Sequence, residues 1–316
     1  MSIAFTFPGQ GSQSVGMGKA LADAFPEARA VFEEVDDALG ASLSKIMWEG
    51  DAEELTLTTN AQPALMSVSI AAMRVLEARG LDLKSSVAYV AGHSLGEYSA
   101  LAAAGSIGLA DTARLLRTRG QAMQEAVPVG VGAMAALLGL DFEAAVEIAA
   151  EAADGNEVCE AANDNAPGQV VISGHKAAVE RAVELAKAKG AKRALMLPVS
   201  APFHCSLMKP AADVMATALG NTEILAPAVP LVANVLAAPI SDPAEIGNRL
   251  VEQVTGRVRW RESVEWMAQN GVTTIVEIGS GKALTGMAKR IEKSLEAIAV
   301  GGAEDIDALI ERIGKE

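Results

Sequence analysis

Residues 87–100 read VAYVAGHSLGEYSA, and this stretch decides both the fold and the chemistry of the chain. Its first residues form a short apolar run that predicts a buried strand over 87–90. Helical patterns follow over 97–125, in two pieces separated between Gly105 and Gly108. The G-x-S-x-G sequence between strand and helix is typical of a nucleophile elbow. Small residues on both sides of Ser94 allow a sharp turn that raises its hydroxyl above the sheet.

The same turn predicts part of an oxyanion hole and requires a base. The backbone N–H of Leu95 lies where the next helix begins, so it would point toward negative charge developing on an attacked carbonyl. A serine hydroxyl also needs a base, and the chain has three histidines. His93 adjoins Ser94 on a turn where neighbouring side chains diverge, and His175 begins a predicted helix. His204 lies in a loop after a strand, where catalytic groups concentrate, so it ranks ahead of His175.

Strands and helices alternate in both outer parts of the chain. We expect strands at 3–7, 87–90, 229–233 and 274–278, a helical region up to 39, an irregular stretch over 48–59, and helices at 62–79, 243–254, 264–269, 283–293 and 306–313. The middle section predicts strand 134–140, helix 142–153, strands 158–162 and 169–173, helix 176–189 and strand 193–198, which is the βαββαβ order of a ferredoxin-like unit.

These patterns predict an α/β fold with two domains. An α/β-hydrolase-like large domain with a mainly parallel sheet would comprise residues 1–127 and 199–316. A ferredoxin-like small domain would be inserted as residues 128–198.

The bulk composition excludes several classes of function. The formal net charge of −14 disfavours binding to nucleic acid or to anionic membranes. The longest apolar stretch, residues 129–140, is broken by glycine and is shorter than the roughly 20 residues that a membrane span needs. Cys159 and Cys205 do not make a disulfide framework, so a cytoplasmic protein is expected, and the N-terminus does not read as a signal peptide. With so few histidines and cysteines, we expect no metal and no bound cofactor.

Four short blocks, in order and at matching spacing, resemble the malonyl-CoA:acyl carrier protein transacylase family. They are FPGQGSQ at 7–13, GHSLGE at 92–97, RGQAM at 119–123 and SAPFH at 200–204. Three further blocks fit the same family: ANDNAPGQ at 162–169, LVEQ at 250–253 and EIGSGK at 277–282. The resemblance covers nearly the whole chain.

The resemblance implies a ping-pong acyl transfer. Ser94 would become malonylated by malonyl-CoA, His204 would move the proton, and the thiol of acyl carrier protein would then accept the malonyl group. A backbone carbonyl at Gln253 would orient the histidine, although Asp213 or Asp242 in a hydrolase-like triad stay open as alternatives.

The resemblance also implies the substrate contacts. The N–H of Gln10 would complete the oxyanion hole with that of Leu95. Arg119 would hold the malonyl carboxylate, which is worth about 1.5–3 kcal/mol for a charged hydrogen bond, although Arg114 and Arg117 share its helix and such arginines are commonly solvated. Phe203 would restrict the acyl site to unbranched malonyl. Met123 and Met134 are candidates for the lining of the acyl pocket, although methionines at such spacing are more often plain core, and Asn163 is a candidate for a contact with the thioester or the pantetheine.

Other interpretations are weaker. Gly9-Gln10-Gly11 begins like a dinucleotide fingerprint, but Ser14 stands where the third glycine is needed, and residues 279–283 lack the full phosphate-loop pattern. A serine esterase or thioesterase would use the same elbow, and a carrier-docking protein without turnover would share the fold. The chain is expected to act as a monomer. Its carrier-binding patch is placed at Lys187, Lys189, Lys192 and Arg193, the most basic local stretch of the insertion.

Overall fold

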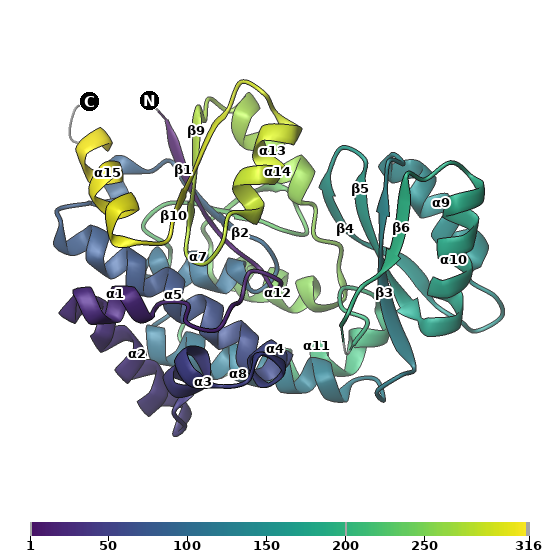
Figure 1. The fold of residues 1–316 in the computed structure, drawn as a ribbon, viewed down its shortest axis with the longest axis horizontal. Coiled ribbons are helices and arrows are strands. Elements are labelled where there is room, and N and C mark those ends of the chain that lie inside the picture. The colour runs from purple at the N-terminus through teal and green to yellow at the C-terminus, as the bar shows by residue number, and fades with distance from the viewer. Residues whose placement is uncertain (1, 200, 314–316) are drawn as a thin grey trace.

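The computed structural model describes residues 2–199 and 201–313 and contains two units, each built on its own sheet. Figure 1 shows them side by side, with the smaller unit formed by the middle of the chain. Ser200, part of the fourth family block, lies outside the described residues. No helix in the described residues combines the length and the apolar character needed to cross a bilayer.

The large unit has a six-stranded sheet in the order β10-β9-β1-β2-β7-β8. All neighbours are parallel except β7 and β8, which pair antiparallel. The strands are β1 (Ile3–Phe7), β2 (Tyr89–Gly92), β7 (Leu231–Ala233), β8 (Ala238–Ile240), β9 (Thr274–Ile278) and β10 (Glu296–Val300). The predicted α/β fold with a mainly parallel sheet is confirmed.

Helices cover both faces of this sheet, as Figure 1 shows. Along β1, Phe5 and Phe7 face one core, whereas Ala4 faces a second core together with Trp260 of α13. This alternation is expected of a central strand that is buried on both sides. The helices of the large unit are α1 (Lys19–Ala24), α2 (Pro26–Leu39), α3 (Leu43–Glu49), α4 (Ala52–Thr56), α5 (Thr58–Ala78), α6 (Leu83–Ser86), α7 (Gly96–Ala103), α8 (Leu109–Glu125), η1 (Ser206–Met208), α11 (Lys209–Gly220), α12 (Pro243–Thr255), α13 (Trp260–Gln269), α14 (Ala283–Ile291) and α15 (Ala303–Ile313).

The small unit has the predicted βαββαβ order. It comprises β3 (Gly132–Leu138), α9 (Phe142–Ala152), β4 (Cys159–Ala166), β5 (Gln169–His175), α10 (Lys176–Ala188) and β6 (Arg193–Met196). The strands pair antiparallel in the order β4-β5-β3-β6, and α9 and α10 pack on the sheet over a separate apolar core. This is the ferredoxin-like arrangement. The boundaries at 128 and 198 stay predictions.

The expectation of an irregular stretch over 48–59 was wrong. Residues 43–56 form two short helices, α3 and α4, and α5 already begins at Thr58. Each short helix is only one or two turns long, so its apolar residues repeat too few times to be recognised. Asp51 marks the start of α4, because its side chain accepts the backbone N–H of Glu53. The sequence prediction also missed α11, β8 and β10.

Close packing of α5 on α8 positions the middle of α8. A Cβ atom added at Gly120 would lie 2.7 Å from the carbonyl oxygen of Thr58, which belongs to the first turn of α5. Only glycine allows the two backbones to approach this closely. The side chain of Arg119, next along α8, is thereby held against α5.

Replacing Gly120 by alanine is expected to destabilise the protein by about 1–3 kcal/mol, because the added methyl group overpacks a helix contact. Urea unfolding followed by circular dichroism measures this change. Gly286→Ala is the matched control, since its Cβ would meet nothing within 4 Å on the exposed side of α14. That variant should gain about 0.5–1 kcal/mol from helix propensity. Equal stabilities for the two variants would contradict the packing argument.

Candidate active site

Ser94 lies on a strained turn between β2 and α7. Its φ angle is +54°, in the left-handed region that residues with side chains rarely adopt. Strain of this kind persists only where the surrounding structure enforces it, and it concentrates at functional sites. The side chain of Asn234 enforces it here by accepting the N–H of Ser94 at 2.8 Å and donating to the carbonyl of Gly92 at 2.7 Å.

Both flanking glycines are required by space. A Cβ atom at Gly92 would lie 1.9 Å from the carbonyl of Gly96, and one at Gly96 would lie 2.2 Å from the carbonyl oxygen of Phe7. No side-chain movement relieves a clash with backbone atoms. The strand-to-helix turn therefore needs the G-x-S-x-G sequence that the chain contains.

His204 reaches Ser94 from the loop that follows the small unit. Its Nε2 lies 2.7 Å from the Oγ of Ser94. Its Nδ1 lies 2.9 Å from the carbonyl oxygen of Gln253 and 3.2 Å from that of Gly256. Carbonyl oxygens only accept hydrogen bonds, so Nδ1 carries the proton and Nε2 presents its lone pair to the serine. The arrangement is that of a serine with a general base.

The imidazole of His204 is held in its neutral form. Burial lowers its pKa to about 3, and the positive charge of Arg119 adds to this effect. Neutral imidazole is the form that can take a proton from a hydroxyl. At neutral pH the base is therefore ready to act.

No carboxylate orients His204 among the described residues, so the hydrolase-like alternatives were wrong. Asp213 forms an ion pair with Lys209 on the surface of α11. Asp242 caps α12 by accepting the N–H of Glu245 at 2.9 Å.

The two other histidines are engaged elsewhere. The Nε2 of His93 lies 2.8 Å from the side-chain oxygen of Asn165, and burial lowers the pKa of this histidine. His93 also lines the cavity in front of Ser94. The Nδ1 of His175 accepts the N–H of Val158 at 2.8 Å, within the small unit.

Gln10, in the turn after β1, and Leu95, at the start of α7, both line the cavity beside Ser94, and each carries a backbone N–H. Among the described residues neither N–H has a hydrogen-bond acceptor. The side chain of Gln10 is tied by the hydroxyl of Thr58, which donates to it at 3.1 Å. Free donors of this kind can stabilise an oxyanion.

Arg119 is buried beside Ser94, with only 1% of its surface exposed. Its Nη1 donates to the side-chain oxygen of Gln62 at 2.7 Å. Its Nη2 donates to the side-chain oxygen of Gln253 at 2.7 Å and to the Oγ of Ser94 at 3.1 Å. No carboxylate of the described residues lies within ion-pair distance of it, although a buried charge normally has such a partner.

The neighbouring arginines differ from Arg119. Arg114 is exposed and pairs with Asp111, whereas Arg117 donates to the side chain of Asn60 at 2.7 Å. The solvated position typical of helix arginines therefore applies to Arg114 and not to Arg119.

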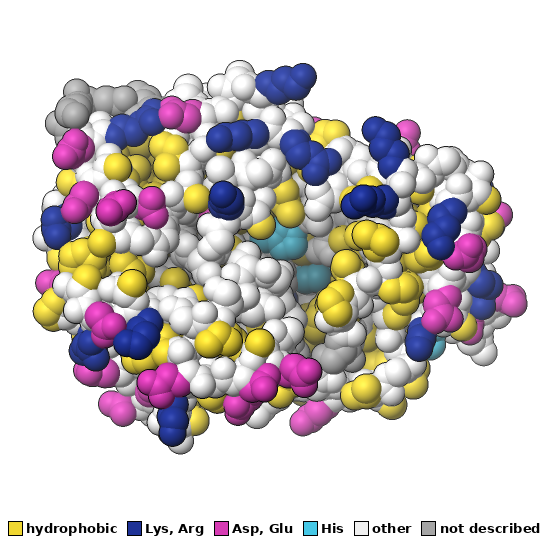
Figure 2. Space-filling model, viewed as in Figure 1, with side chains coloured by type: hydrophobic (Ala, Val, Ile, Leu, Met, Phe, Trp, Pro, Cys, Tyr) yellow, Lys and Arg dark blue, Asp and Glu magenta, His cyan; other side chains and the backbone are white. Residues whose placement is uncertain are grey.

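The cavity that contains these groups has a volume of about 470 Å³ and lies between the two units. Figure 2 shows histidine side chains at the bottom of the corresponding hollow. The remaining acyl-site candidates all line it: Met123, Met134, Asn163 and Phe203. The structure thus brings every predicted site residue together around Ser94, with Gln253 reaching the cavity through Arg119 and His204.

Four polar residues of the site were missed. Gln62 holds Arg119, Asn165 holds His93, and Asn234 holds the turn at Ser94. The fourth, Glu97, is buried against the side chain of Gln253, and burial raises its pKa to about 7. Glu97 and Asn165 lie inside the family blocks at 92–97 and 162–169, and this position in the sequence could have identified them as site residues.

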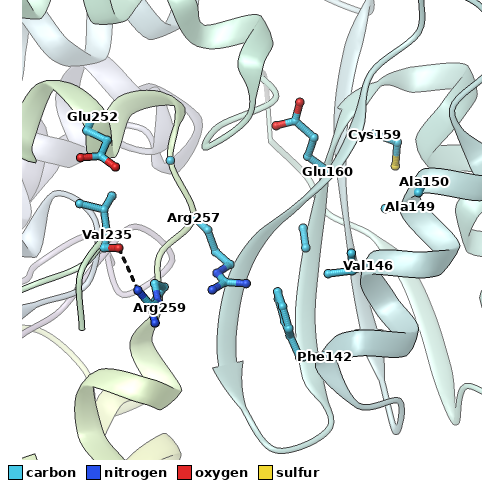
Figure 3. Close-up of a pocket in the computed structure, with 12 residues that line it drawn as sticks. Phe142, Val146, Ala149, Ala150, Cys159, Glu160, Val235, Glu252, Arg257 and Arg259 are labelled. Atoms are coloured by element: carbon cyan, nitrogen blue, oxygen red, sulfur yellow. Dashed lines mark hydrogen bonds between the residues drawn. The ribbon is translucent and has the colours of Figure 1, made fainter. Parts of the chain in front are cut away.

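A second hollow of about 510 Å³ lies between α9 and β4 of the small unit and residues 252–259 of the large unit. Figure 3 shows the side chains of Arg257 and Phe142 next to each other in its lining, and the guanidinium lies 4.3 Å from the ring centroid. Arg257 and Arg259 both pair with Glu262. Burial raises the pKa of the Cys159 thiol to about 12, so this hollow contains no reactive nucleophile at neutral pH. Among the described residues no group of three or more metal-binding side chains gathers.

Comparisons with known proteins agree with this geometry. Residues 4–307 match the acyl transferase domain family. The chain is 47% identical over 314 residues to the malonyl CoA-acyl carrier protein transacylase of Bacillus subtilis, covering 99% of this chain and 98% of that one. It is also similar to the crystal structure of acyl-carrier-protein-S-malonyltransferase from Bartonella henselae, with 60% identity, a TM-score of 0.98, and coverage of 99% of this chain and 100% of that one.

A second similar structure is that of a type II PKS acyl-carrier protein in complex with its malonyl-transacylase. The identity is 45% and the TM-score 0.95, and the match covers 99% of this chain and 100% of that chain.

The pKa of His204 predicts how Ser94 reactivity depends on pH. Because the neutral base is lost only as pH falls through a pKa of about 3, labelling of Ser94 by a fluorophosphonate should stay constant between pH 8 and pH 5. A histidine with an ordinary pKa would halve the labelling rate constant at a pH of about 6.5. The rate constant of labelling, measured by intact-protein mass spectrometry, checks this. Arg119→Met removes a positive charge that lowers the pKa of His204. In this variant the pH at which labelling of Ser94 is half-maximal should therefore be higher than in the wild type. A wild-type midpoint near 6.5 would contradict the argument.

Proposed function

The chain belongs to the acyl transferase domain family, and from this premise and the site geometry we propose that it is a malonyl-CoA:acyl carrier protein transacylase. It moves the malonyl group of malonyl-CoA to the pantetheine thiol of acyl carrier protein through an ester of Ser94. The observation that carries the proposal is the buried guanidinium of Arg119, whose Nη2 lies 3.1 Å from the nucleophilic oxygen.

In the first half-reaction the Nε2 of His204 takes the proton of the Ser94 hydroxyl. The serine oxygen attacks the thioester carbonyl, and the resulting oxyanion is held by the N–H groups of Gln10 and Leu95. Collapse of the intermediate breaks the carbon–sulfur bond. The CoA sulfur leaves with the proton that His204 carries, and malonyl-Ser94 remains.

The second half-reaction runs the same steps in reverse with another thiol. His204 takes the proton of the carrier's pantetheine thiol, and the sulfur attacks the ester carbonyl. The oxyanion forms at the same two N–H groups. Its collapse breaks the bond between the acyl carbon and the Ser94 oxygen, which takes the proton back from His204, and the malonyl thioester of the carrier is released. All the protein groups in both halves come from one chain, which supports a monomer as the active unit.

The malonyl carboxylate is the feature that Arg119 selects. A single CH₂ group separates this carboxylate from the attacked carbonyl, so it must lie close to Ser94. Arg119 already donates there to neutral oxygens, and its charge has no carboxylate partner among the described residues. The carboxylate supplies the missing partner by a paired hydrogen bond. Phe203 in the cavity wall limits the space for a branched acyl group.

A serine hydrolase is the second candidate, because it would use the same elbow and base. It gives no account of a buried, unpaired arginine beside the nucleophile. The two free, buried cysteines support the proposal of a cytoplasmic protein.

Incubation with labelled malonyl-CoA is expected to give a malonyl adduct on Ser94, detected by mass spectrometry of peptides. Adding phosphopantetheinylated carrier protein should then move the label to the carrier. Ser94→Ala should form no adduct. Release of the label to water would instead support the hydrolase, and absence of an adduct in the wild type would support a binding protein.

Replacing Arg119 by methionine is expected to lower kcat/KM for malonyl-CoA by roughly ten- to a hundredfold, the value of a charged hydrogen bond. Acetyl-CoA lacks the carboxylate, so kcat/KM for acetyl-CoA should fall by a smaller factor than kcat/KM for malonyl-CoA. The control is Arg114→Met, on the exposed side of the same helix. A parallel loss for both acyl groups would show that Arg119 does not select the carboxylate.

Carrier docking is proposed at the basic stretch of the small unit. Lys187 and Lys189 form ion pairs with Glu184 and Glu151, so their charges are partly offset, and Lys192 and Arg193 are the better targets. The double variant Lys192→Glu/Arg193→Glu should raise KM for the acidic carrier, measured in a steady-state assay. It should leave the rate of acylation by malonyl-CoA unchanged, measured in a single-turnover assay. An unchanged KM would place docking elsewhere on the molecule.

A further inference from the structure

Glu97 is a buried carboxylate that the proposed steps do not use. It lies at the second residue of α7, three positions after the nucleophile, with 1% of its surface exposed. Its Oε2 accepts the side-chain Nε2 of Gln253 at 2.5 Å. No lysine or arginine of the described residues forms an ion pair with it. A buried carboxylate without a direct cation is costly and calls for a reason.

Gln253 connects Glu97 to both reactive groups of the site. Its backbone carbonyl accepts from His204. Its side-chain Oε1 accepts from Arg119 at 2.7 Å, while its Nε2 donates to the carbonyl of Ser94 at 3.0 Å and to Glu97.

The carboxamide of Gln253 can work in only one of its two orientations. With the oxygen toward Arg119, every contact pairs a donor with an acceptor. Turned over, the amide nitrogen would face the guanidinium donors and the oxygen would face two acceptors. The carboxylate of Glu97 is one of those two acceptors, so it helps to exclude the reversed orientation.

The insertion of an amide between the two charges also leaves Arg119 available. A direct Arg–Glu pair would occupy the guanidinium fork that a substrate carboxylate needs. Here the carboxamide of Gln253 separates Glu97 from the guanidinium, and the fork keeps donors for a ligand.

We propose that Glu97 is a positioning residue for acyl selectivity: it fixes the Gln253 carboxamide with its oxygen toward Arg119, so that the guanidinium is aligned for the malonyl carboxylate. This inference rests on the proposed function. It differs from a purely structural role, in which Glu97 would only stabilise the first turn of α7 and so affect all acyl groups alike.

The test is the ratio of kcat/KM for malonyl-CoA to that for acetyl-CoA in single-turnover acylation of Ser94. Glu97→Ala is expected to lower this ratio roughly tenfold, through a weaker hold on the carboxylate. Glu97→Gln keeps an oxygen that can accept from Gln253, so it should keep the ratio within about twofold of the wild type, well under the tenfold effect of a lost hydrogen bond.

A double-mutant cycle tests whether Glu97 acts through Gln253. Gln253→Leu removes the carboxamide and keeps the backbone carbonyl that His204 uses, so it should lower the ratio as Glu97→Ala does. In the double variant the ratio should fall no further than in Gln253→Leu alone, because the effects of substitutions within one hydrogen-bond network do not add. Glu223→Gln, at an exposed position, is the control for the loss of a surface carboxylate.

Each outcome has a definite meaning. An unchanged ratio in Glu97→Ala would overturn the inference. A double variant whose ratio falls by the combined effect of the two single substitutions would overturn it as well. If Glu97→Ala does not fold, Gln253→Leu decides: an unchanged ratio in that variant would overturn the inference, because the carboxamide through which Glu97 acts would then not affect acyl selectivity. A wild type that does not prefer malonyl-CoA to acetyl-CoA would overturn the proposed function itself, whatever the variants do.

Discussion

The active site depends on one backbone conformation, the left-handed turn at Ser94. The turn has a φ of +54° and places the hydroxyl in front of the sheet. Two glycines without space for a Cβ and one asparagine that bonds to both sides of the turn keep it in place. This oxygen is the reference point of the site. The base His204, the free N–H of Leu95 and the guanidinium of Arg119 can act in the reaction only because of where they lie relative to it.

The inserted unit contributes to this site mainly through its return to the large unit. Its last strand, β6, leads into the loop that carries Phe203 and His204, and His204 also has a positive φ, of +59°. Its sheet supplies Met134 and Asn163 to the lining of the cavity. The small sheet packs on α9 and α10 over one core, whereas Met134, Ala162 and Val171 of the same sheet belong to the core of the large unit. The insertion is therefore anchored on the large unit and holds the catalytic loop beside the parallel sheet.

Much of this architecture could be predicted from the sequence, for identifiable reasons. The elbow has a local signature, and three histidines leave few candidates for a base. Strand β1 was predicted to the residue because five apolar or β-branched residues end at a Pro-Gly turn. Helices α3 and α4 were missed because they are too short to show a period. The roles of Gln62 and Asn234 could not be predicted, since they depend on side-chain amides that meet residues 57 and 140 positions away.

The electrostatics of the site follow from which groups are neutral. His204 is neutral because burial and the nearby guanidinium both lower its pKa. Arg119 donates to amide and hydroxyl oxygens and has no direct carboxylate partner in the part of the chain that the structure describes, so its charge is solvated by the protein but not cancelled. A carboxylate entering the cavity would cancel that charge and, by the same effect, raise the pKa of His204 toward its ordinary value. The base would then hold the serine proton more strongly when the acidic substrate is bound, so that substrate recognition and proton transfer are coupled through a single arginine.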